Sequence, residues 1–105
     1  MKTYYGRRTP YGMSDVWITD EQGTRQSLAP RHDLRNHSPT GFEWGYGGSG
    51  PAQLALALLA DALANDQMAL KHYQEFKWSV ISKLEGEWRL TELEIRGFVE
   101  SPGSP

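Results

Sequence analysis

Cysteine is absent from the 105 residues. This absence excludes a disulfide framework, a thiolate nucleophile and the cysteine-based zinc sites. A long hydrophobic run is also lacking, because the longest, Ala52–Ala64, is interrupted by Gln53 and Asp61 and is shorter than the roughly 20 residues that span a bilayer. Residues 1–8 lack the apolar core of a signal peptide. We therefore expect a soluble, cytoplasmic protein without a membrane partner.

A strong surplus of one charge is missing too. The formal net charge is −2, with six basic and five acidic side chains in residues 1–50 and five basic and eight acidic ones in residues 51–105. Neither half has the basic footprint of a nucleic-acid-binding domain, so nucleic acid is a possible partner but not the favoured one. The length suits a single domain over residues 1–100, followed by a flexible tail at 101–105.

The first half of the chain reads as short strands separated by turns. Alternating or β-forming residues predict strands over Lys2–Arg8, Asp15–Thr19, Arg25–Leu28 and Phe42–Tyr46. In the last segment, the three aromatic side chains share one face. The short connections between the first three strands favour an antiparallel meander.

Helical patterns fill the second half. We predict helices over Pro51–Ala64, over Gln67–Leu84 and from Thr91 onward. The first is apolar nearly all round, which is typical of a helix buried at the centre of a fold. Asn65 and Asp66 cap the second, and Thr91 with Glu94 forms a capping box for the third. The order indicates an α+β fold: an antiparallel sheet of about four strands with two to three helices packed on one face.

A glycine-rich segment joins the predicted fourth strand to the first helix. Its residues are Gly47, Gly48, Ser49 and Gly50, with Ser49 or Gly50 as the helix cap. Backbone amides at a helix N-terminus can hold an anion, and Arg31 and Arg35 could supply bidentate contacts to a phosphate. The segment matches neither a P-loop nor a dinucleotide fingerprint. The plainer interpretation is a tight corner in which glycine lets the backbone pack closely.

Candidate catalytic residues are few and scattered. His32, Asp33 and His37 have no recognised metal spacing, and sequence alone cannot align them with Ser49 as a triad. Glu43 is a lone carboxylate that we expect to pair with a basic residue on a neighbouring strand. We therefore predict no catalytic residues, no metal site and no cofactor.

Two tryptophans stand apart from the apolar stripes. Trp78 lies outside the stripe of the second helix, so it either docks under the C-terminal segment or belongs to a partner surface. Trp17 faces away from Val16 and Ile18. It too either packs against another part of the chain, on the other side of the sheet, or belongs to a partner surface. The aromatic and basic residues of the first strands could stack on single-stranded nucleic acid, or the aromatics could simply pair across strands. These residues are Tyr4, Tyr5, Arg7, Arg8, Tyr11, Trp17 and Arg25.

A nineteen-residue run, Gly41-Phe42-Glu43-Trp44-Gly45-Tyr46-Gly47-Gly48-Ser49-Gly50-Pro51-Ala52-Gln53-Leu54-Ala55-Leu56-Ala57-Leu58-Leu59, resembles the signature of a domain-of-unknown-function family, number 6166. Later residues resemble that family's later segments: Tyr73, Phe76, Lys77, Trp88, Leu90, Thr91, Glu94 and Ile95. The resemblance implies relatives in bacteria, archaea and phages, and an accessory role on mobile elements. It carries no activity with it.

These observations rank binding above catalysis. We expect a small non-enzymatic binding or regulatory protein that acts through a protein partner. One alternative is a module that binds a phosphate-bearing ligand, nucleotide or nucleic acid, at Gly47–Gly50. Another is an anti-defence inhibitor that docks on a host nucleic-acid-targeting complex. The oligomeric state does not follow from the sequence.

Overall fold

The computed structural model describes residues 1–100, so the predicted tail at 101–105 lies outside the described residues. The elements follow one another as β1 (Thr3–Arg8), β2 (Ser14–Thr19), β3 (Arg25–Ser27), α1 (Ser49–Leu63), α2 (Asp66–Ser79), the 3-10 helix η1 (Ile81–Lys83), β4 (Trp88–Thr91) and α3 (Glu92–Glu100). No helix in residues 1–100 is long and apolar enough to cross a membrane.

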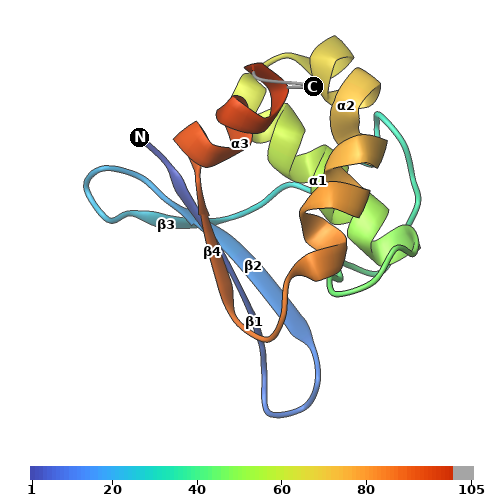
Figure 1. The fold of residues 1–105 in the computed structure, drawn as a ribbon. Helices are drawn as coiled ribbons and strands as arrows, with labels where there is room; N and C mark the ends of the chain where they lie inside the picture. Colours follow the sequence, from blue (N-terminus) through green and yellow to red (C-terminus); the bar gives the residue numbers. More distant parts are fainter. Residues whose placement is uncertain (101–105) are drawn as a thin grey trace.

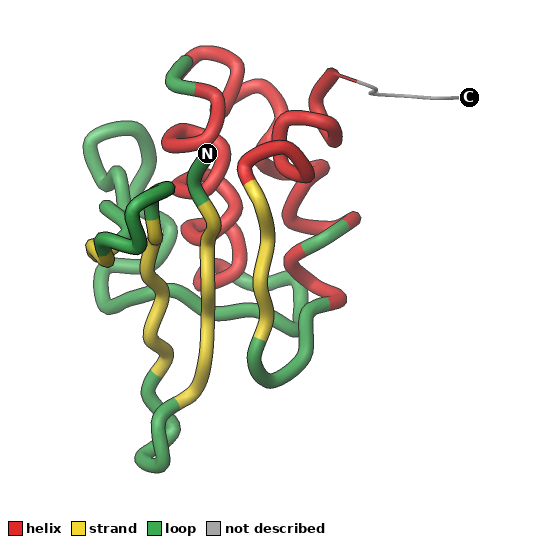
Figure 2. Tube along the Cα trace, turned by 90° about the vertical axis from the view of Figure 1, so that its left-hand side faces the viewer, coloured by secondary structure: helices red, strands yellow, loops and turns green. Residues whose placement is uncertain are grey.

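The strands form one antiparallel sheet in the order β3-β2-β1-β4. The helices lie together on one side of this sheet, and the other side is left uncovered (Figures 1 and 2). Alternation along each strand assigns the side chains to the two faces. Tyr4 is buried opposite Ile18, whereas Tyr5 lies opposite Trp17 on the uncovered face. The predicted α+β class and its helix-covered sheet are confirmed.

Helix α1 forms the centre of the core, as its all-round apolar sequence predicts. Twelve of its fifteen residues are buried, since α2 and α3 pack on it and the sheet covers another side. Tyr4, Val16 and Ile18 meet it from the sheet. The alanines of α1 let these neighbours approach closely, and its leucines fill the space between them.

The predicted caps of α2 and α3 are confirmed, whereas that of α1 is wrong. Asn65 Oδ1 accepts a hydrogen bond from the Met68 amide at 3.1 Å. Thr91 and Glu94 form the reciprocal capping box, with both main-chain-to-side-chain bonds at 3.0–3.1 Å. Helix α1 begins at Ser49 with Gly48 as its cap, so neither Ser49 nor Gly50 is the cap. Helix α2 ends at Ser79, before the predicted Leu84.

The predicted strand over Phe42–Tyr46 is wrong. This segment is an irregular loop, and the fourth strand is β4, close to the C-terminus. The backbone of Gly45 has a φ of +90°, which breaks an extended run. Trp44 instead anchors the loop, because its ring is buried and its Nε1 donates to the Gly86 carbonyl at 3.0 Å.

Candidate functional site

The glycine-rich segment forms a close-packed turn at the start of α1. A Cβ on Gly47 would lie 2.2 Å from the Trp78 ring, and one on Gly50 would lie 2.7 Å from the Glu43 Cβ. Both positions therefore need glycine for packing. Ser49 is exposed, and within residues 1–100 the amides of Ser49 and Gly50 donate to no protein acceptor.

The two arginines assigned to the same site are engaged elsewhere. Arg31 forms hydrogen bonds with Asp33 at 3.0 Å and with Asp66 at 2.7 Å. Asp66 begins α2, so this ion-pair cluster lies beside the C-terminal end of α1, opposite the glycine turn. The Arg31 guanidinium lowers the pKa of the Asp33 carboxyl below its usual range. Arg35 donates to the neighbouring Leu34 carbonyl at 2.7 Å.

The scattered polar residues each have a separate structural partner. His32 Nε2 lies 2.9 Å from the Ser38 carbonyl oxygen, and His37 Nε2 lies 2.7 Å from the Tyr73 hydroxyl. Glu43 accepts from Arg8 at 2.6 Å, so its expected basic partner is confirmed, but Glu43 lies in a loop and the pair is not a cross-strand pair. No hydrogen bond joins any two of these candidate residues within residues 1–100, nor does that part of the chain hold three metal-ligating side chains in one group.

Trp78 lies against the glycine turn and not under the C-terminal segment. Its ring covers Gly47, its side chain remains 57% exposed, and the Lys77 ammonium lies 4.4 Å from its ring centroid. The C-terminal segment packs without it, because Phe98 meets Phe76 edge to face at 5.1 Å. Trp78 is therefore an exposed aromatic that serves as a cover for the turn.

Trp17 lies at the centre of the uncovered face of the sheet. Its ring stacks on Tyr5 at 5.4 Å between centroids and 13° between planes. The guanidinium of Arg25 lies 4.0 Å from the Trp17 centroid and that of Arg7 lies 5.2 Å away. Tyr5 on β1 and Arg25 on β3 flank β2, so they approach the indole from opposite sides. These contacts hold the indole ring in one orientation.

We call this surface the open sheet face, and it comprises Tyr5, Arg7, Asp15, Trp17, Arg25 and Arg89. Arg89 belongs to it because β4 pairs with β1 and puts Arg89 opposite Tyr5. A shallow hollow of about 450 Å³ lies between β1 and β4, lined by four of these residues together with Gly6, Glu87 and Trp88. Asp15 lies 3.6 Å from the Arg7 guanidinium and 3.3 Å from that of Arg25.

Arg89 is the residue of this face that sequence reasoning missed. The alternation of Trp88, Arg89 and Leu90 is the pattern of a strand with one exposed side, but the nearby capping box suggested only the approach to a helix. Had β4 been assigned, its pairing with β1 would still have required the three-dimensional structure, because the paired residues are more than 80 positions apart.

Comparison with known proteins gives a family without an assigned activity. No curated protein and no solved structure matches the chain. The model of a family of unknown function, DUF6166, matches residues 4–101, which include β1 from its second residue onward, the other described strands and helices α1, α2 and α3. The chain therefore belongs to the DUF6166 family.

Proposed function

We propose that the protein is a non-enzymatic binding or regulatory protein that acts through a protein partner, and that the open sheet face is the surface that binds it. The observation that carries this proposal is the stacked Tyr5–Trp17 pair flanked by arginines on a sheet face that no helix covers. Tryptophan, tyrosine and arginine are the residues most enriched at the energetic centres of protein interfaces.

The rigidity of the pair supports the same proposal. An interface side chain that is already ordered loses little conformational entropy on binding, and a free rotamer-rich side chain costs about 0.5–1.5 kcal/mol to immobilise. Trp17 is held by Tyr5, Arg7 and Arg25 before any partner arrives. Its ring edge is therefore presented in one orientation, as a preformed anchor.

The hairpin between β1 and β2 extends this surface. Its tip projects from the body of the molecule (Figure 1), and it carries Tyr11 and Met13, which are 91% and 68% exposed. The same two strands carry Tyr5 and Trp17. A partner that covers the open sheet face and the hairpin tip would bury apolar surface at both, which favours a protein over a small ligand.

Phosphate binding at the N-terminus of α1 is the second candidate. The free amides of Ser49 and Gly50 favour it. The Glu43 side chain, which packs against Gly50, puts a carboxylate near the turn, and Arg31 is held by Asp33 and Asp66. Glu43 is itself paired with Arg8, so Arg8 and Arg31 are both engaged with carboxylates, and this candidate has the weaker support.

Affinity capture with matched tryptophan variants tests the main proposal. Tagged wild-type protein and the Trp17→Ala and Trp78→Ala variants are expressed in cells of the source organism, and captured proteins are quantified by mass spectrometry. Trp17→Ala should reduce capture of the partner at least about tenfold, as for a central interface tryptophan. Trp78→Ala should leave it unchanged. Loss of capture with Trp78→Ala alone would refute the assignment of the open sheet face. A partner that belongs to a nucleic-acid-targeting defence complex would support the anti-defence alternative.

A further inference from the structure

Arg89 is an exposed cation with no carboxylate partner among residues 1–100. The other two arginines of the open sheet face share Asp15. Each guanidinium carries five N–H donors, so a single carboxylate leaves most donors of both free. The face thus retains directed donors at both ends of the Tyr5–Trp17 pair.

The same geometry restricts what can bind. The two faces of the Trp17 ring are occupied by Tyr5 on one side and by Arg25 on the other. Modules that bind single-stranded nucleic acid use open ring faces on which bases stack. Trp17 therefore offers its ring edge and not an open face, and the guanidinium groups beside it have in-plane N–H pairs that match the two oxygens of a carboxylate.

Charge is distributed unevenly between this face and the rest of the molecule. The open sheet face and its hollow have three arginines and two carboxylates, those of Asp15 and Glu87. Removing these five from the eleven basic and thirteen acidic side chains leaves eight basic and eleven acidic ones elsewhere. An acidic partner would therefore be attracted to this face and repelled by the remaining surface, which fixes its orientation on approach.

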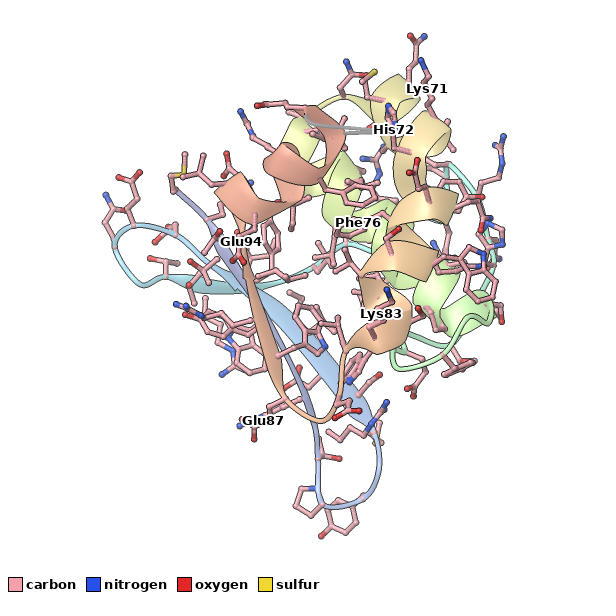
Figure 3. The ribbon with its side chains drawn as sticks, in the orientation of Figure 1. Lys71, His72, Phe76, Lys83, Glu87 and Glu94 are labelled. Carbon is pink, nitrogen blue, oxygen red and sulfur yellow. The ribbon has the colours of Figure 1, made fainter. Side chains whose placement is uncertain are left out.

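We propose that the open sheet face binds an acidic segment of a protein, with Asp or Glu carboxylates received by Arg89 and by the free donors of Arg7 and Arg25. This inference rests on the proposed function and names the chemistry of the partner. Glu87 lines the hollow beside Arg89 and lies at the turn that precedes β4 (Figure 3). Its carboxylate opposes the binding of an acidic segment there, and the three arginines outweigh it.

A titration with defined polymers tests this chemistry. Isotope-labelled protein is titrated with poly-L-glutamate, with poly-L-glutamine as the uncharged control and with oligothymidylate as the nucleic-acid probe, and amide and indole signals are followed by NMR. Poly-L-glutamate should shift signals of Tyr5, Trp17 and Arg89 first, and added salt should weaken the effect. Poly-L-glutamine should leave these signals in place.

Charge variants identify the residue responsible. Arg89→Glu should weaken the poly-L-glutamate affinity at least about tenfold, and Arg89→Gln should weaken it less. Lys71→Glu is the matched control, because Lys71 is an exposed lysine on α2, a helix on the covered side of the sheet (Figures 1 and 3). It changes the net charge equally and should have little effect.

Two results would overturn the inference. Oligothymidylate could bind this face more tightly than poly-L-glutamate, which would assign it to nucleic acid. Alternatively, Arg89→Glu and Lys71→Glu could weaken poly-L-glutamate binding equally. That result would show that binding depends on the net charge of the protein and not on a specific site at Arg89. Either outcome leaves the Trp17-dependent capture of a protein untouched, so it is distinguishable from failure of the proposed function.

Discussion

At the scale of single residues, two polar side chains in the buried helix α1 hold distant parts of the chain. Gln53 is fully buried and makes four hydrogen bonds to backbone groups of residues 30–38. Asp61 accepts from the Tyr4 hydroxyl at 2.6 Å and from Lys2 Nζ at 3.2 Å. In the sequence both look like interruptions of an apolar run. Their role becomes visible only when the segments they bind are brought together.

Gln53→Leu should lower the free energy of unfolding by about 2–3 kcal/mol. An unsatisfied buried polar group costs about 1–3 kcal/mol, and the loop can move some of its freed groups to water. Urea denaturation measures the loss, and faster amide exchange in residues 30–38 should accompany it. Gln74→Leu, on the exposed side of α2, is the control and should change stability by less than about 0.5 kcal/mol. Equal losses in both variants would contradict the anchoring role.

Tyr4 should make the fold sensitive to alkaline pH. Its burial, followed by its hydrogen bond to Asp61, raises the pKa of the hydroxyl well above its ordinary value of 10. The folded state thus keeps a proton that the unfolded chain loses above pH 10. The stabilisation is complete below that pH and is lost progressively as the pH rises further.

Urea denaturation of the wild type and of Tyr4→Phe at pH 8 and pH 11 measures this effect. The other tyrosines titrate in both proteins, so the difference between the two isolates Tyr4. The wild type should lose more stability than Tyr4→Phe over this range. Parallel losses would mean that the Tyr4 hydroxyl ionises as easily in the folded state as in the unfolded one.

At the scale of elements, local patterns predicted those parts whose determinants are local. The burial of α1, the Asn65 cap and the Thr91–Glu94 capping box all follow from neighbouring residues. The fourth strand did not, because β4 exists through its pairing with β1 at the other end of the chain. The alternating aromatic residues of Phe42–Tyr46 belong to a loop that is anchored by the buried Trp44, and they do not form a strand.

Gly6 shows how closely β1 and β4 approach. A Cβ there would lie 2.3 Å from the Trp88 indole, which is itself packed edge to face on Trp44 at 5.6 Å. Gly6→Ala should therefore cost about 1–3 kcal/mol through overpacking. Gly97→Ala is the opposite case, because this exposed glycine in α3 has no atom within 4 Å of an added Cβ.

Gly97→Ala should raise stability by about 0.5–1 kcal/mol, since alanine is the better helix former. Thermal denaturation should show a lower melting temperature for Gly6→Ala and a higher one for Gly97→Ala. A neutral Gly6→Ala would show that Trp88 moves aside freely and that the β1–β4 contact is loose.

At the scale of the whole molecule, the helices cover one side of the sheet (Figure 2). The other side carries a preformed array of tryptophan, tyrosine and arginine. The sequence identified Trp17 as a candidate residue of a partner surface, but it could not show that Arg89 lies on the same face of the sheet. The glycine turn, which stands out most in the sequence, is packed under Trp78 and beside Glu43. The feature that is most distinctive in the sequence is thus explained by packing, and the proposed site lies on the far side of the sheet.

Site-specific photo-cross-linking in cells of the source organism tests the open sheet face most directly. A benzophenone amino acid is introduced at Thr19, which follows Trp17 by two residues along β2 and lies on the same side of the sheet as the open sheet face, and at Lys71 on α2 as the control. We predict one discrete cross-linked protein from position 19, its loss when Trp17→Ala is added, and none from position 71. A cross-linked protein from position 71 and none from position 19 would contradict the account.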